Sequence, residues 1–232
     1  MSFPDFSVDD AKTQWKRLCD LLWFHDGLGV WLDVSRMRIN AADFERLEPG
    51  FKTAFEAMQQ LEAGAIANPD EQRQVGHYWL RAPELAPSET VGSHVATEID
   101  QIEQFGKDVL SGAIKAPCGK PFTDVLWIGI GGSGLGPMLM VRALQRPNAG
   151  LPFHFFDNVD PDGMSTVLAG LGDRLKTTLV VTVSKSGGTP EPHIGMEQAR
   201  LRLDAVGGSW PEQAVAITMA DSKLDQQASQ QG

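Results

Sequence analysis

The stretch VLWIGIGGSG at residues 125–134 decides the fold, because an apolar run of β-strand type leads directly into a glycine-rich loop. A second stretch, LVVTVSKSGGT at residues 179–189, repeats this order. Short apolar runs are typical of buried parallel strands, and glycine-rich turns connect such strands to helices. Both loops are therefore expected at the carboxyl edge of one parallel sheet, where open α/β sheets bind ligands.

From Phe122 onward the chain alternates β-rich runs with helical segments. Strands are predicted at residues 124–130, 152–157, 178–183 and 213–219, and helices at residues 135–145, 162–171 and 190–206. This alternation indicates an α/β fold with a doubly wound, flavodoxin-like parallel sheet. Only a short polar helix start at residues 221–224 follows the last strand, so the domain is expected to be truncated.

Residues 1–121 are predicted to form a helical N-terminal region, separated from the domain at residues 122–232 by breakers at residues 117–121. In residues 8–62 apolar side chains recur every three to four positions. The side chains expected to face the core are Trp15, Leu18, Leu22, Phe51, Phe55 and Met58.

Local signals in this region predict where its elements begin and end. Asp9 is the expected N-cap of the first helix, residues 27–29 its stop, and residues 30–34 a short extended piece. Residues 68–81 are predicted to turn into a helix with Arg73, His77 and Arg81 on one face, favoured as a hydrogen-bonded structural face over a ligand-binding one. A further helix is predicted at residues 89–110.

Composition narrows the classes of protein. The chain has 232 residues, 42% of them hydrophobic, and a formal net charge of -10, which argues against a nucleic-acid surface. Cys19 and Cys118 have no metal-ligand spacing and are expected to be reduced thiols. The sequence contains no apolar run of the ~20 residues that span a bilayer and no signal peptide at its start, so a cytoplasmic protein without membrane contact is expected.

The first loop taken alone leaves two kinds of ligand open. Gly129, Gly131 and Gly134 match the G-x-G-x-x-G pattern of dinucleotide-binding domains, and Asp157 ends the next strand, where such domains place a ribose-binding acid. A capping or turn role for Asp157 is favoured, because further turn-forming residues follow it directly. An NAD-binding Rossmann domain remains the less favoured alternative.

The second loop favours a phosphate group. Ser184, Ser186 and Thr189 supply hydroxyl donors, and Lys185 supplies a cation. Pro190 suits the first turn of a helix whose unpaired amides and dipole attract an anion. Three hydroxyls, two glycines and a helix start within six residues therefore predict a phosphomonoester site.

Longer motifs in the chain resemble the glucose-6-phosphate isomerase (phosphoglucose isomerase) family, whose members contain sugar isomerase (SIS) domains. The motifs that carry the resemblance are GIGGS at residues 129–133 with LGP at 135–137, NVDPDG at 158–163, SKSGGTPE at 184–191, NPDEQR at 68–73 and HYWLR at 77–81. FHDGLG at residues 24–29 and DVSRM at 33–37 resemble the cyanobacterial or a related bacterial branch.

This resemblance implies reversible conversion of glucose 6-phosphate to fructose 6-phosphate, through ring opening and a cis-enediol, with no metal or organic cofactor. The substrate- and phosphate-binding residues it implies are Gly132, Ser133, Ser184, Lys185, Ser186 and Thr189. Glu191 corresponds to a family glutamate near the ring-opening histidine and is the catalytic candidate. Family members are commonly homodimers.

The family's glutamate base and its ring-opening histidine and lysine belong to a later region of the family's longer chains. The present chain is therefore expected to be an N-terminal part, with helical lead and first SIS domain, that binds sugar phosphate weakly and does not turn it over. The alternative within the same fold is a non-catalytic SIS module that senses a sugar phosphate.

Overall fold

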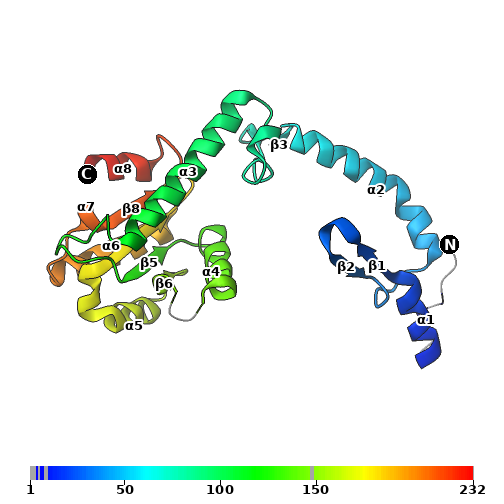
Figure 1. The fold of residues 1–232 in the computed structure, drawn as a ribbon, viewed down its shortest axis with the longest axis horizontal. Coiled ribbons are helices and arrows are strands. Elements are labelled where there is room, and N and C mark those ends of the chain that lie inside the picture. The colour runs from blue at the N-terminus through cyan, green and yellow to red at the C-terminus, as the bar shows by residue number, and fades with distance from the viewer. Residues whose placement is uncertain (1–3, 5, 8–9, 147–148, 232) are drawn as a thin grey trace. The chain divides into compact units, whose positions relative to one another are not determined.

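The computed structural model describes residues 4, 6–7, 10–146 and 149–231. The chain divides into two compact units, Met1–Ile99 and Asp100–Gly232, and helix α3 (Glu89–Ser111) belongs partly to each (Figure 1). The helix expected at residues 89–110 is thus confirmed. The division at residue 121, which the helix breakers at residues 117–121 suggested, stays a prediction.

The first unit combines helices with two small hairpins. Its elements are α1 (Ala11–Leu21), β1 (Leu22–His25), η1 (Asp26–Leu28), β2 (Val30–Asp33), α2 (Ala41–Glu62), β3 (Ile66–Asn68), β4 (Arg73–Gln74) and η2 (Pro83–Leu85). Strands β1 and β2 pair antiparallel, as do β3 and β4. The extended piece expected at residues 30–34 is confirmed as β2.

Several predictions for α1 and its end are wrong. The helical pattern of residues 8–62 is interrupted by the β1–β2 hairpin, and residues 27–29 lie in its loop rather than at a helix stop. Asp9 lies outside the described residues; Asp10 caps α1 by accepting a 3.0 Å hydrogen bond from the amide of Thr13. β-strand pairing of aromatic residues such as Trp23 and Phe24 has here overridden the helical spacing.

The stripe of apolar residues on α1 and α2 does not face a core. Trp15 is 66% exposed and Phe55 67% exposed, and α2 has no buried residue. Phe51 and Met58 are likewise exposed. Leu18 on α1 is half-buried, and Tyr78 Oη donates to Met58 Sδ at 3.8 Å, but no side chain of α2 is buried among the described residues. The expectation of a buried stripe is therefore wrong for α2.

A buried arginine organises the start of the first unit. Arg17, on α1, donates hydrogen bonds to the carbonyl oxygens of Ser35 and Pro4, both at 2.7 Å, and of Met37 and Ile39, both at 2.8 Å. Its side chain is fully buried. The guanidinium therefore ties α1 to the turn after β2 through backbone oxygens.

The helix predicted at residues 68–81 is absent from the structure, which has a β3–β4 hairpin and turns there. Asn68 Oδ1 accepts hydrogen bonds from the amides of Asp70 and Glu71, both at 3.1 Å, and so closes a turn in place of a helical one. Arg73 pairs with Glu71 at 3.2 Å, and the His77 ring lies against Tyr78. The expected common helix face of Arg73, His77 and Arg81 is therefore wrong.

The second unit confirms the α/β prediction. Its strands are β5 (Asp124–Ile128), β6 (Phe153–Phe156), β7 (Thr178–Val183) and β8 (Ala214–Ile217), and its helices are α4 (Gly132–Leu144), α5 (Pro161–Leu171), η3 (Gly172–Thr177), α6 (Pro190–Ala205), α7 (Trp210–Gln213) and α8 (Lys223–Gln231). The four strands are all parallel, in the order β6-β5-β7-β8.

Alternate residues of the central strands enter two cores. Leu126 and Val180 pack with residues of α5 and α6 on one face, and Val125 and Leu179 pack with Val109 of α3 on the other. Helices therefore cover both faces, as a doubly wound sheet requires (Figure 1).

Candidate functional site

The candidate site lies where the strand order reverses. From β5 the chain moves outward to β6, then crosses back to β7 on the other side of β5 and continues to β8. Strands β5 and β7 are direct neighbours, with Ile128 opposite Thr182. The loops at residues 129–134 and 184–189 leave these two strands at the same edge, which is the switch point where such sheets bind ligands.

The first loop is a tight strand-to-helix turn. A Cβ at Gly134 would overlap the carbonyl oxygen of Gly129, and Gly131 has a φ of 56°. The Ser133 carbonyl oxygen accepts a 2.8 Å hydrogen bond from Trp127 Nε1. Gly132 differs, because a Cβ there would meet no atom within 4 Å. The turn explains Gly134, whereas the exposed Gly132 leaves room for a ligand.

Two serine hydroxyls shape the second loop. Ser184 Oγ accepts a hydrogen bond from the amide of Gly187, and Ser186 Oγ accepts one from the amide of Gly188, both at 3.2 Å. Each hydroxyl keeps its own hydrogen for a further acceptor. Gly187 has a φ of 65°, and a Cβ there would overlap the backbone nitrogen of Leu224. The loop therefore packs closely against the start of α8.

The end of the second loop begins α6. Thr189 is the N-cap residue and makes no side-chain cap hydrogen bond, and Pro190 is the first helical residue. Glu191 follows in the first turn and is partly exposed, and Lys185 is exposed. Hydroxyls, the helix N-terminus and a lysine thus converge on one short segment, which suits an oxyanion.

The connection from β8 to α8 was not singled out from the sequence. Thr218 Oγ1 donates to the carbonyl oxygen of Ser184 at 2.7 Å, and Ser222 Oγ lies 2.6 Å from Thr218 Oγ1. The side chain of Lys223 passes near Gly188. The signal was present as the hydroxyl residues of TMADS, at residues 218–222, directly after a predicted strand.

The hydrogen bonds of the residues after β6 support the capping or turn role that the sequence favoured for Asp157 and its neighbours. Asp160 caps α5 by accepting hydrogen bonds from the amides of Asp162 at 3.2 Å and Gly163 at 3.1 Å. Asn158 Oδ1 accepts one from the amide of Asp160, and Asp157 accepts one from the Asn158 side chain. The capping itself falls to Asp160 rather than Asp157.

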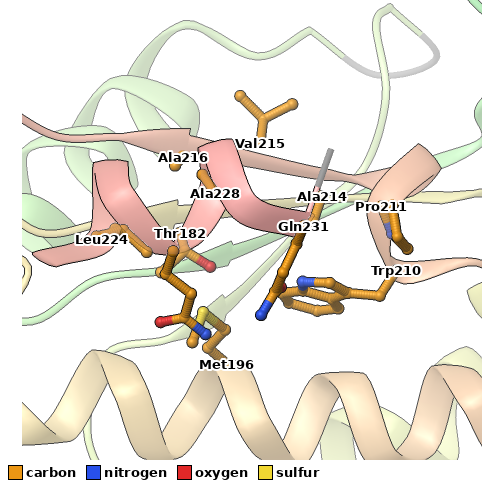
Figure 2. A pocket seen from close by; sticks show the side chains of 11 residues that line it. Thr182, Met196, Trp210, Pro211, Ala214, Val215, Ala216, Leu224, Ala228 and Gln231 are labelled. Carbon is orange, nitrogen blue, oxygen red and sulfur yellow. The ribbon is translucent and has the colours of Figure 1, made fainter.

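A separate cavity of about 70 Å³ lies between α8, α6 and β8. Figure 2 shows Thr182, Met196 and Trp210 around it. Within the described residues, the buried hydroxyl of Thr182 has no hydrogen-bond partner. None of the residues of the two loops lines this cavity, so it is distinct from the switch-point site.

The fold and its loops define a class, a doubly wound α/β domain with two polar, glycine-rich loops at its switch point. The family model for phosphoglucose isomerase matches residues 33–229, and the chain belongs to that family. This membership argues against the dinucleotide interpretation of the first loop.

Named relatives give the same assignment. The chain is 73% identical over 232 residues to a glucose-6-phosphate isomerase of Parasynechococcus marenigrum strain WH8102, covering 100% of this chain and 42% of that protein. It is 72% identical over 232 residues to one of Synechococcus sp. strain CC9605, covering 100% and 44%. The chain thus spans about two-fifths of the length of the curated relatives it matches, and the expected cyanobacterial or related bacterial type is confirmed.

A solved structure has the same fold. The glucose-6-phosphate isomerase of Chlamydia trachomatis superposes with a TM-score of 0.74 at 26% identity, covering 95% of this chain and 43% of that one. Among the described residues there is no group of three His, Cys, Asp or Glu placed to hold a metal. None of the described helices is both long enough and apolar enough to cross a membrane.

Proposed function

We propose that the protein to which this chain belongs is an aldose-ketose isomerase that interconverts glucose 6-phosphate and fructose 6-phosphate, in glycolysis and gluconeogenesis, without a cofactor. Ring opening and proton transfer through a cis-enediol are the proposed steps. The observation that carries the proposal is the hydroxyl-rich loop at residues 184–189, at the carboxyl edge of the parallel sheet in a chain that belongs to the phosphoglucose isomerase family.

In this proposal the phosphate group occupies the second loop. Ser184, Ser186 and Thr189 donate their hydroxyl hydrogens to its oxygens. At the start of α6 the amide of Glu191 adds a further donor, since Pro190 and Pro192 have no N–H. Lys185 adds a charge-assisted bond, about twice as strong as a neutral one. These contacts bind the part of the substrate that does not react.

The first loop then holds the sugar. Gly132 lets the backbone approach closely, since it has open space where a side chain would stand, and Ser133 offers its hydroxyl. Glu191, in the first turn of α6, is the proposed acidic contributor near ring opening. The chain spans about two-fifths of the length of its named relatives, and we assign the main base to the part of those longer proteins that it does not cover.

The biological setting is part of the same proposal. The second unit is an SIS domain in the sense of the family resemblance, and the whole protein is a cytoplasmic homodimer whose small-molecule partner is a sugar phosphate. Neither nucleic acid nor a membrane is a partner, in keeping with the net charge of -10.

The most specific test removes a hydroxyl that makes no helix-capping hydrogen bond in the folded chain. Thr189 makes no cap hydrogen bond, so Thr189→Val in the complete gene product should leave the melting temperature unchanged. We expect KM for fructose 6-phosphate to rise about tenfold, equivalent to about 1.4 kcal/mol, with kcat little changed.

The matched control is Thr97→Val, an exposed threonine of α3 that donates to the Ser93 carbonyl oxygen. This variant should behave as wild type in the isomerase assay. An unmodified protein that does not isomerise sugar phosphate, or that is stabilised against heat by NAD and not by fructose 6-phosphate, would overturn the proposal.

A further inference from the structure

The first two carbonyl groups of the second loop are held by the segment that follows β8. The carbonyl oxygen of Ser184 accepts from Thr218 Oγ1 at 2.7 Å, and that of Lys185 accepts from the amide of Met219 at 3.3 Å. The amide of Ser184 donates to the carbonyl oxygen of Ile217 at 3.1 Å. Residues 217–219 therefore fix the backbone from which the loop departs.

The number of hydroxyl hydrogens determines which group donates and which accepts in the contacts of Thr218. A carbonyl oxygen only accepts, so Thr218 directs its single hydroxyl hydrogen to the Ser184 carbonyl oxygen at 2.7 Å, with the Lys185 carbonyl oxygen a longer second acceptor at 3.4 Å. The 2.6 Å contact between Thr218 Oγ1 and Ser222 Oγ must then use the hydrogen of Ser222. Ser222 Oγ in turn accepts from the amide of Asp225 at 3.0 Å, in the first turn of α8. One directed chain thus runs from Asp225 through Ser222 and Thr218 to Ser184.

The planarity of the peptide bond carries this constraint to the other side of the loop. In a trans peptide the C=O and the following N–H point in opposite directions, and the described residues contain no cis peptide. Holding the Ser184 carbonyl toward Thr218 turns the amide of Lys185 away from it. The Lys185 carbonyl, held by Met219, does the same for the amide of Ser186. Among the described residues the Ser186 amide has no acceptor, so it remains available to an anion.

We propose that Thr218 is a positioning residue for phosphate binding, with Ser222 supporting it. Thr218 does not touch the phosphate. It aims the amide of Lys185 by holding the carbonyl of Ser184, and its longer 3.4 Å contact with the Lys185 carbonyl oxygen helps Met219 to aim the amide of Ser186. The proposal rests on the phosphate role assigned above to residues 184–189. Hydrogen bonds in a chain strengthen one another, so the loss of one link weakens the rest.

The test compares three variants in the complete gene product. Thr218→Val keeps the shape and removes the donor, Thr218→Ser restores the hydroxyl, and Thr166→Val is the matched control. Thr166 Oγ1 donates to the carbonyl oxygen of Asp162 at 2.8 Å on α5, so the control loses one bond of the same kind. The dissociation constant of inorganic phosphate, KM and kcat for fructose 6-phosphate, and the melting temperature are measured for each.

We expect Thr218→Val to raise the phosphate dissociation constant and KM together by about tenfold, with kcat within twofold of wild type. Thr218→Ser should return both within twofold, and Thr166→Val should change neither. A Thr218→Val protein with a lowered melting temperature and an unchanged phosphate dissociation constant would show a merely structural residue and overturn the proposal. Should that variant not fold, Ser222→Ala takes its place, with a weaker rise expected and an unchanged constant again contradicting the proposal.

Failure of the proposed function is distinguishable from failure of this inference. A wild type that isomerises sugar phosphate while Thr218→Val binds phosphate normally refutes only the positioning role. An inactive wild type whose phosphate binding Thr218→Val weakens refutes only the isomerase. A wild type that binds no phosphate refutes both.

Discussion

Each of the two units of this chain is stabilised internally by a different kind of interaction. In the second unit, apolar residues of parallel strands such as Leu126 and Val180 are fully buried between helices. Among the described residues of the first unit, the most deeply buried side chain is that of Arg17, and the long helix α2 has no buried residue. The spacing of apolar residues therefore predicts which side chains are buried in the second unit but not on α2 of the first.

The largest expected difference concerns deletion of apolar side chains. Leu126→Ala removes a fully buried side chain from β5 and should destabilise the second unit by about 3 kcal/mol. Phe55→Ala removes one that is 67% exposed and should change stability by less than about 0.5 kcal/mol. Chemical denaturation checks both, and equal losses would mean that α2 is buried in solution.

The next effect concerns the buried arginine. Arg17→Met leaves four carbonyl oxygens without their donor and should destabilise the first unit by about 2–3 kcal/mol. Hydrogen exchange should rise in α1 and remain slow in β5 and β7. Exchange that rises equally in both units would contradict independent anchoring of the first unit.

Substitutions of two glycines in the first loop should distinguish an effect on stability from an effect on ligand binding. Gly134→Ala places a Cβ against the carbonyl oxygen of Gly129 and should destabilise the second unit by about 2 kcal/mol. Gly132→Ala, at the first residue of α4, should leave stability unchanged or slightly higher. It should nevertheless weaken binding of fructose 6-phosphate. Thermal unfolding with and without that ligand distinguishes the two, and unimpaired binding by Gly132→Ala would argue against close approach of the ligand there.

The smallest effect is a pH dependence at the start of α2. The amide of Asn40, followed by the Arg46 side chain, lowers the pKa of Asp43 below its ordinary 3.8. Because the folded pKa is the lower one, this capping stabilisation is present above pH 3.8 and is lost as the pH falls through the lowered pKa. A carboxyl NMR titration should give a midpoint below 3.8, while Asp43→Asn should abolish the pH response of the first turn; a midpoint at or above 3.8 would exclude the capping box.

The same contrast explains what the sequence could predict. In the second unit the central strands β5 and β7 are buried, so their short apolar runs predicted them, and the predicted bounds of β7 are the observed ones, Thr178–Val183. The partly buried outer strands β6 and β8 and the helices α4, α5 and α6 were predicted within a few residues, whereas η3 and α7 were not predicted. In the first unit, aromatic strand pairing decided the structure around residues 22–33, and a polar side chain decided it around residue 68. The Asn68 side chain closes a turn where helical spacing predicted a helix. The spacing of residues along the sequence does not show such a side-chain hydrogen bond.

The candidate site was predictable in part for a related reason. The topology follows from right-handed crossovers, so the sequence placed both glycine-rich loops at one edge of the sheet. The contacts of Thr218 and Ser222 with the second loop depend on where β8 ends and on the orientation of two hydroxyls. The side-chain pattern of one strand does not contain that information.

The most direct test of the central claim, that residues 184–189 bind phosphate at the switch point, is a titration of the 232-residue chain with inorganic phosphate, followed by amide NMR. We predict that the largest shifts fall on the amides of residues 185–189, with smaller ones at Gly132 and Ser133. The Thr189→Val chain should need a higher phosphate concentration for the same shifts. Shifts spread over surface lysines and arginines, with none in these loops, would contradict the account.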